Sequence, residues 1–238
     1  MTRRVVRCLS WLVLGVASAG GVSCRGREAA PPAAAARPGA AADAGTAVRP
    51  VAPRPRIVIL GDSLTAGLGL PQHDAYPARL QQRLDAAGYG FEVVNAGVSG
   101  DTSADGFGRL EWALDGEVRV LVVALGGNDG LRGLPPEQMR RNLAGIIERA
   151  RARGIAVMLA GMETPTSMGP DYQRRFHEVF PSLAREYRTP FLPFLLEGVA
   201  GHPDLNQHDG IHPTAEGARI VAGHVWEVLE PMVRAASR

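Results

Sequence analysis

The sequence predicts an α/β fold, with a five-stranded parallel sheet covered by helices on both faces in one doubly wound domain. From residue 56 onward, short apolar runs alternate with longer segments of helical periodicity, and this alternation is typical of a parallel sheet. The apolar runs contain few polar residues, so the sheet is expected to be buried on both sides. The chain has 238 residues, of which 45% are hydrophobic, and this permits a sizeable core.

Each strand and helix is predicted from its own stretch of sequence. Five runs have the length and β-branching of buried strands: Ile57–Leu60, Phe91–Asn95, Val118–Ala124, Ile155–Ala160 and Phe191–Phe194. Five segments have helical periodicity: Pro77–Ala87, Asp105–Leu114, Pro136–Arg153, Tyr172–Tyr187 and Thr214–Arg234. Gly88 and Gly154 stand where glycine commonly ends a helix, and Pro136 stands where proline commonly opens one.

The first 24 residues have the features of a secretion signal peptide. Arginines precede a short apolar run, Leu9–Val16, which is too short to span a bilayer comfortably. Small residues follow and end in Val22-Ser23-Cys24, which resembles the lipobox of bacterial lipoproteins, whose cysteine becomes the lipidated first residue. The alternative is an ordinary cleaved signal peptide with an incidental cysteine. The sequence thus predicts export to the bacterial periplasm or cell envelope, with membrane contact only through a lipid anchor at Cys24.

Residues 25–54 are rich in Ala, Pro, Gly and Arg and contain almost no large apolar side chains. Such a segment cannot bury enough surface to offset its ordering entropy, so it is predicted to be a disordered linker. The folded domain is expected to span residues 55–236.

Composition disfavours several classes of function. The formal net charge is only +2, the arginines are spread out and aromatic content is 5%, so nucleic acid is not an expected partner. Both cysteines, Cys8 and Cys24, precede residue 25, so the mature domain is expected to have no disulfide, Cys-ligated zinc or thiol nucleophile. No two histidines share a His-x-x-x-His spacing with an intervening Glu, so no zincin-type metal site is expected.

Four loops rich in glycine and short polar residues follow predicted strands or precede the last helix. They are Gly61-Asp62-Ser63-Leu64, Ala96–Thr102, Leu125–Asp129 and His208–Pro213. Parallel sheets bind ligands in the loops at the carboxyl ends of their strands, so we expect these four loops to converge. Each loop alone is a weak signal, because glycine loops also serve only to turn the chain.

The residues of these loops suit nucleophilic catalysis. The hydroxyl of Ser63 needs an adjacent base, and His212 is the best candidate because histidine titrates near neutral pH. Asp209, three residues earlier, is suitably placed to orient the imidazole in a Ser-His-Asp arrangement. His208 is the competing base. The structural alternatives are a turn serine that caps a helix and, for residues 209–212, a turn before a helix N-cap.

An acyl-transfer reaction also needs hydrogen-bond donors for the oxyanion of its tetrahedral intermediate. The predicted donors are the backbone N–H groups of Ser63 and Gly100 and the side-chain amide of Asn128. Glycine at position 100 lets the backbone approach a substrate closely. Asp62 and Asp129 are interpreted as hydrogen-bond acceptors that brace the loops rather than as catalysts.

Together the four loops resemble the four sequence blocks of the SGNH hydrolases, also called GDSL esterases and lipases. The resemblance covers residues 56–233 and implies a flavodoxin-like three-layer α/β/α fold that needs no metal or cofactor. It implies a complete catalytic set: the nucleophile Ser63, the oxyanion donors Ser63, Gly100 and Asn128, the acid Asp209 and the base His212. Two segments are similar to the bacterial arylesterase and thioesterase/lysophospholipase branch, namely Val98–Ser103 and Asp209–Pro213.

The resulting hypothesis is an exported serine esterase that hydrolyses small carboxylic esters or thioesters, with lysophospholipid as a plausible natural substrate. Residues 68–71, 162–170 and 195–205 are candidates for lining an acyl pocket, with ordinary surface loops as the alternative. The second hypothesis is an O-acetyl esterase acting on envelope polysaccharide, and the third is a non-catalytic binding lipoprotein. Fold and triad alone do not select the ester, and the sequence leaves the oligomeric state open.

Overall fold

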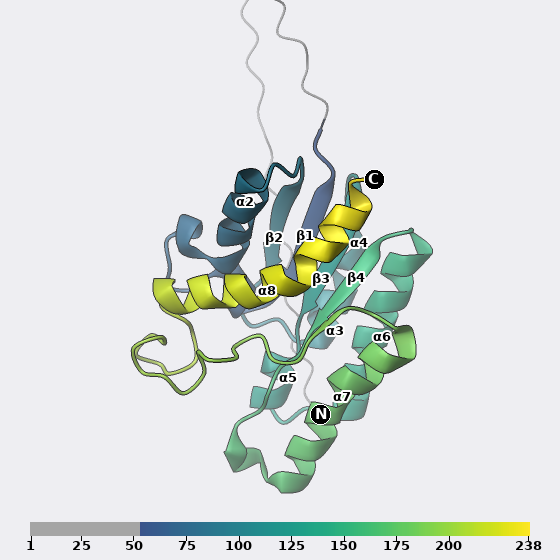
Figure 1. Ribbon diagram of the computed structural model, residues 1–238. Coiled ribbons are helices and arrows are strands. Elements are labelled where there is room, and N and C mark those ends of the chain that lie inside the picture. The colour runs from purple at the N-terminus through teal and green to yellow at the C-terminus, as the bar shows by residue number, and fades with distance from the viewer. Residues whose placement is uncertain (1–52) are drawn as a thin grey trace, which may run out of the picture. The chain divides into compact units, whose positions relative to one another are not determined.

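The computed structural model describes residues 53–238, which contain a five-stranded parallel sheet (Figure 1). Its strands are β1 (Arg56–Gly61), β2 (Glu92–Gly97), β3 (Val118–Ala124), β4 (Ala156–Ala160) and β5 (Phe191–Leu192). They are arranged in the order β2-β1-β3-β4-β5, and all neighbours are parallel. The chain winds in opposite directions from β1 and β3, so a topological switch point, where such sheets bind ligands, lies between these two strands.

The predicted signal peptide, Cys24 and residues 25–52 of the predicted linker lie outside the described residues. The domain boundaries and the lipid anchor therefore stay predictions. Within residues 53–238, no helix combines the length and the apolar character needed to cross a bilayer.

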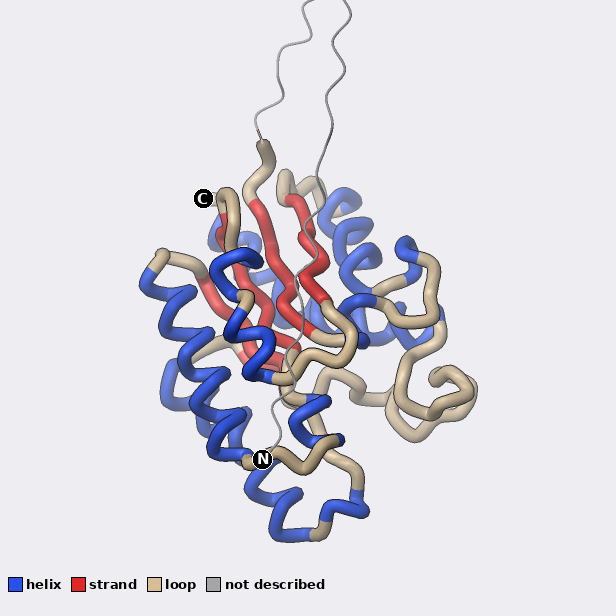
Figure 2. Tube along the Cα trace, turned by 180° about the vertical axis from the view of Figure 1, so that it is seen from behind, coloured by secondary structure: helices blue, strands red, loops and turns tan. Residues whose placement is uncertain are grey.

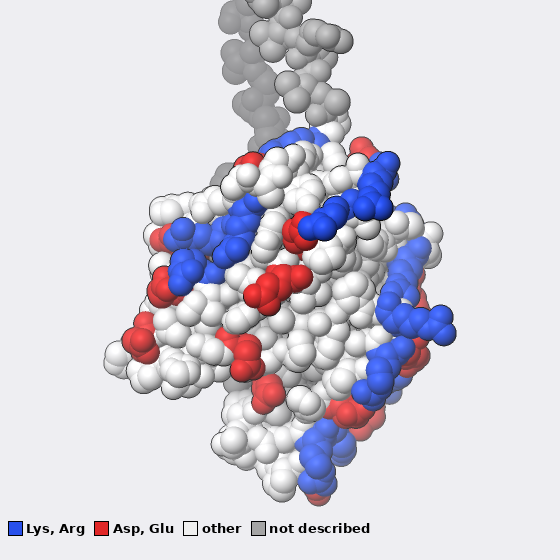
Figure 3. All heavy atoms as spheres, viewed as in Figure 1, with Lys and Arg blue, Asp and Glu red and all other residues white. Residues whose placement is uncertain are grey.

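Helices on both faces of the sheet complete three layers. α2 (Tyr76–Ala86) and α8 (Ala215–Ala236) pack against each other on one face, and α8 crosses in front of the sheet in Figure 1. The opposite face, seen in Figure 2, is covered by α3 (Ser103–Gly108), α4 (Leu110–Ala113), α6 (Pro136–Ala152) and α7 (Pro170–Tyr187). Where α6 and α7 meet solvent, arginines are interspersed with carboxylates (Figure 3). Arg175 of α7 and Glu137 of α6 form one such ion pair.

The core is built on the three central strands, β1, β3 and β4. Their residues Ile57–Leu60, Val120–Ala124 and Val157–Ala160 are buried, because helices cover both faces of the sheet. This arrangement explains why these strands read as unbroken apolar runs in the sequence. α6 contributes an apolar face at three-and-four spacing, formed by Met139, Leu143, Ile146, Ile147 and Ala150.

The predicted elements differ from the structure most clearly in two places. β5 has only two residues, and the helix predicted over residues 105–114 is two helices, α3 and α4, separated at Arg109. Arg109 has φ −102° and ψ 10°, outside helical geometry. Four short elements could not be predicted from hydrophobic periodicity, because each has five residues or fewer. They are α1 (Ser63–Ala66), α5 (Gly127–Leu131) and the 3-10 turns η1 (Gln72–Asp74) and η2 (Thr166–Met168).

Candidate active site

Ser63 is the first residue of α1, directly after the carboxyl end of β1. The cap of this short helix is Asp62, whose Oδ1 accepts a hydrogen bond of 3.0 Å from the backbone N–H of Leu64. Gly67, with φ 76° in the left-handed region, closes the other end. The capping role therefore falls to Asp62, and the hydroxyl of Ser63 is left available for another partner.

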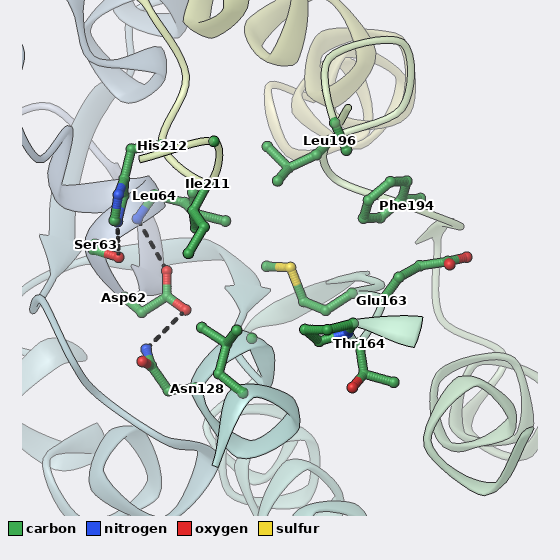
Figure 4. A pocket seen from close by; sticks show the side chains of 16 residues that line it. Asp62, Ser63, Leu64, Asn128, Glu163, Thr164, Phe194, Leu196, Ile211 and His212 are labelled. Atoms are coloured by element: carbon green, nitrogen blue, oxygen red, sulfur yellow. Dashed lines mark hydrogen bonds between the residues drawn. The ribbon is translucent and has the colours of Figure 1, made fainter. Parts of the chain in front are cut away.

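That partner is His212. Its Nε2 lies 2.9 Å from Ser63 Oγ (Figure 4). Its Nδ1 lies 2.6 Å from Asp209 Oδ2. Asp209 Oδ1 also accepts the backbone N–H groups of His212 and Ile211, so the loop presents its acid and its base in one tight turn. These two N–H groups and the imidazole hold the pKa of Asp209 well below its usual range. The structure thus joins the three predicted residues by a relay of hydrogen bonds, in the order Ser63, His212 and Asp209.

The competing base, His208, lies on the same loop but does not join the relay. Its side chain is exposed and makes no hydrogen bond to Ser63. Within residues 53–238, no group of three or more His, Cys, Asp and Glu side chains has an arrangement that could hold a metal ion.

The three predicted oxyanion donors differ in their present partners. Within the described part of the chain, the backbone N–H groups of Ser63 and Gly100 donate to no protein acceptor. Asn128 follows Gly127 at the start of α5, and its Nδ2 donates to the carbonyl of Asp101 at 2.9 Å and to Asp62 Oδ2 at 3.3 Å. The amide of Asn128 is therefore oriented by the two neighbouring loops, which the sequence pattern alone does not reveal.

Residues 59–220 match the GDSL-like Lipase/Acylhydrolase family, and this range contains every predicted catalytic and oxyanion residue. The chain belongs to this family. The resemblance to SGNH hydrolases and the α/β fold class predicted from the sequence are confirmed, and the chain is a serine ester hydrolase.

Individual SGNH relatives support the predicted branch. The chain is 44% identical over 178 residues to the esterase TesA of Pseudomonas aeruginosa, covering 74% of this chain and 89% of that protein. It is 38% identical to thioesterase 1/protease 1/lysophospholipase L1 of Escherichia coli K12, covering 74% of this chain and 84% of the relative. The crystal structure of TesA superposes with a TM-score of 0.72 at 42% identity, covering 74% of this chain and 99% of that structure.

In this SGNH hydrolase, Asp129 braces two of the site loops, as the sequence analysis expects. Its carboxylate accepts the backbone N–H of Ser103 at 2.7 Å and the Ser103 hydroxyl at 2.6 Å. Asn142 Nδ2 donates to the same hydroxyl at 2.9 Å. Burial raises the pKa of Asp129. No role was predicted for Ser103 or Asn142 from the sequence. Asn142 carries a detectable signal, because it is a polar residue on the otherwise apolar face of α6.

Arg109 joins the ends of β1 and β2 beneath the site. Its Nε lies 2.5 Å from Asp101 Oδ2, and its Nη2 donates to the carbonyls of Gly61 at 3.0 Å and Ala96 at 2.8 Å. These contacts hold the guanidinium against the ends of β1 and β2. The loop after β1, which carries Ser63, is thereby fixed to the loop that carries Gly100.

A cavity of about 350 Å³ opens beside Ser63, with Asn128 and His212 in its wall (Figure 4). Most of its other lining residues are apolar: Leu64, Leu131, Met162, Pro165, Phe194, Leu196, Ala200 and Ile211. Two of the segments predicted to line an acyl pocket, residues 162–170 and 195–205, contribute to it. The prediction for residues 68–71 is wrong: they do not line the cavity, and Leu68 and Gly69 instead contact Gln207.

Asp62 makes the free energy of unfolding of the protein dependent on pH. Its side chain is buried, and burial raises its pKa to about 6 from 3.8, although the Leu64 N–H and the charge of His212 act in the opposite direction. The folded state therefore binds the proton more tightly than the unfolded state, so the contribution of Asp62 to stability is complete below about pH 4 and is lost as the pH rises through about 6. At about 1.4 kcal/mol per pKa unit, the loss amounts to about 3 kcal/mol.

We expect Asp62→Asn to remove this dependence. In urea unfolding between about pH 3.5 and pH 7.5, the free energy of unfolding of the wild type should fall relative to that of the variant by about 3 kcal/mol. In this variant the new side-chain amide also faces Asn128 Nδ2, and the loss of that hydrogen bond lowers the free energy of unfolding equally at every pH. Asp115→Asn, which changes an exposed carboxylate, is the control and should follow the wild type. Parallel curves for wild type and Asp62→Asn would contradict the assignment.

Proposed function

We propose that this chain hydrolyses carboxylic esters or thioesters by transferring the acyl group to Ser63. The observation that carries the proposal is the relay of 2.9 Å from Ser63 Oγ to His212 Nε2 and 2.6 Å from His212 Nδ1 to Asp209. Ser63 Oγ attacks the acyl carbon while its proton passes to Nε2, and the same proton then passes to the departing alkoxide or thiolate. Water, activated in the same way, attacks the acyl-enzyme and restores free Ser63.

The negative oxygen of each tetrahedral intermediate is assigned to the N–H groups of Ser63 and Gly100 and to Asn128 Nδ2. The two backbone donors have no protein partner in the described residues, which suits donors that wait for a substrate oxygen. Of the two bonds made by Asn128, the one to Asp62 is longer, at 3.3 Å, and we propose that the oxyanion replaces it. Each such donor contributes about 100- to 1,000-fold in rate.

The cavity favours acyl chains longer than acetyl. It lies beside the nucleophile, has a volume of about 350 Å³ and is lined mainly by aliphatic and aromatic side chains. An acetyl group would leave most of this apolar wall in contact with water, whereas each buried methylene contributes about 0.8 kcal/mol. One relative is named a thioesterase and lysophospholipase, so lysophospholipids and acyl thioesters are the proposed natural substrates. The proposal therefore favours a lipid-directed esterase over an O-acetyl esterase.

A chain-length series of p-nitrophenyl esters and matched acyl thioesters tests this choice. We expect kcat/KM to rise at least about tenfold from acetyl to octanoyl, because the added methylenes enter the cavity. Ala200→Trp should lower the value for octanoyl about tenfold and change that for acetyl little, because Ala200 lines the cavity. Ala200→Ser is the matched control. Strict preference for acetyl would contradict the lipid-directed proposal and favour the polysaccharide O-acetyl esterase.

We also propose that the chain is exported and anchored through Cys24. The support is the sequence of residues 1–24, with its arginines, short apolar run and terminal Val22-Ser23-Cys24. Metabolic labelling with a fatty acid, compared between the wild type and Cys24→Ser, tests the anchor.

A further inference from the structure

The loop that carries Asp209 and His212 is closed at its base and exposed at its tip. Asn206 pairs with Pro213 in an isolated antiparallel bridge, and the backbone N–H of Gln207 donates to the carbonyl of His212 at 2.7 Å. Residues 208–211 are exposed. Because the tip buries little apolar surface, hydrogen bonds must set its position relative to the rest of the site.

Two side-chain hydrogen bonds join this loop, residues 205–214, to the segment after β1, residues 62–71, within the described part of the chain. One is the bond between His212 and Ser63. The other comes from Gln207, whose Nε2 donates to the carbonyl of Leu68 at 2.8 Å. The same nitrogen also donates to the carbonyl of Pro213 at 2.9 Å, directly after the histidine. The carboxamide of Gln207 thus connects the backbone just after α1 to the backbone next to His212.

Gly69 provides the space for this carboxamide. Its φ is 78°, in the region that favours glycine, and a Cβ added there would lie 2.1 Å from Gln207 Oε1. The side chain of Gln207 therefore lies flat against the Gly69 backbone. A larger residue at position 69 would push the carboxamide away from the Leu68 carbonyl.

We infer that Gln207 is a positioning residue that holds His212 at hydrogen-bond distance from Ser63. The inference rests on the proposed function, since it assigns Gln207 a role through the base of that reaction. The carboxamide acts in parallel with the Ser63–His212 contact, so that contact keeps its length while substrate enters and the imidazole changes charge. A displacement of about 1 Å in such a site costs on the order of 100-fold in rate.

The test measures kcat and KM for an ester in the full chain carrying Gln207→Ala, Gln207→Glu or Gln207→Lys. We expect Gln207→Ala to lower kcat about 10- to 100-fold with little change in KM, since Gln207 does not line the cavity. Glutamate has the same shape but no donor, and its carboxylate would face two carbonyls, so Gln207→Glu should lose at least as much. Lysine restores a donor, so Gln207→Lys should recover part of the activity. His208→Ala, an exposed neighbour on the same loop, is the control and should match the wild type.

Two further measurements separate positioning from a general structural role. Labelling of Ser63 by a phosphonate ester requires the base, His212. In the Gln207 variants the labelling rate should therefore fall in parallel with kcat, while the melting temperature stays nearly constant. Gly69→Ala should lower kcat through the same carboxamide, and combining it with Gln207→Ala should cost no more than the larger single effect.

Wild-type kcat in Gln207→Glu, or additive losses in the double variant, would overturn the inference. If Ser63→Ala is inactive while the Gln207 variants match the wild type, the inference alone fails. If Ser63→Ala remains active, the proposed function fails first.

Discussion

Replacing Ser63 by alanine is expected to reduce kcat for a p-nitrophenyl ester by about 10⁴-fold or more, because it removes the proposed nucleophile. The substitution removes one hydroxyl whose hydrogen-bond partner is His212 Nε2. The cap of α1 is provided by Asp62, so the short helix should persist. The loss should therefore be chemical, with the melting temperature nearly unchanged, and steady-state kinetics beside thermal unfolding will measure both.

His212→Ala serves as the partner variant. A nucleophile and its base act as one unit, so the double variant should be no slower than the slower single variant. Labelling by a phosphonate ester should be lost in both. Equal ester turnover by the wild type and Ser63→Ala would end the serine mechanism, and complete absence of turnover in the wild type would favour the non-catalytic binding protein.

Strand prediction succeeded where helices cover both faces of the sheet. Most residues of β1, β3 and β4 are buried, and only Arg56, Arg119 and Ala156 are not, so their sequences carry a strong apolar signal. β5, at the edge of the sheet, pairs through only two residues, and its signal overstated its length. The break between α3 and α4 falls at Arg109, whose side chain contacts the carbonyls of Gly61 in β1 and Ala96 in β2. A local pattern contains no trace of such contacts.

The candidate triad was predictable because a parallel sheet gathers its carboxyl-end loops at one edge. The spacing of Asp209 and His212 suggested a single tight loop, and the structure has that loop. The supporting residues were harder to find. Gln207 has the appearance of an ordinary surface glutamine until its contact with Leu68 is known. The two bonds of Asn128 likewise depend on how separate loops meet.

A second large loss of kcat is expected when Asp209, the acid of the triad, is replaced. Asp209→Asn is expected to lower kcat about 10⁴-fold, as an amide at this position selects the wrong imidazole tautomer. The present carboxylate uses Oδ1 for the N–H groups of Ile211 and His212 and Oδ2 for His212 Nδ1. Asparagine can keep the turn through its oxygen, but its NH₂ then faces Nδ1. The imidazole must carry its proton on Nε2, where it cannot accept the proton of Ser63.

Comparing Asp209→Asn with Asp209→Ala separates the contact to His212 Nδ1 from the turn, since only asparagine retains the turn. Similar losses of kcat in both variants would assign the effect to the lost contact between the carboxylate and Nδ1. Because the pKa of Asp209 is held well below its usual range, Asp209 should stay ionised when the wild type is acidified. The asparagine precedes Gly210 and can deamidate to aspartate, so the variant must be assayed fresh and its mass verified. Activity of Asp209→Asn within about tenfold of the wild type would leave Asp209 only a turn-forming role.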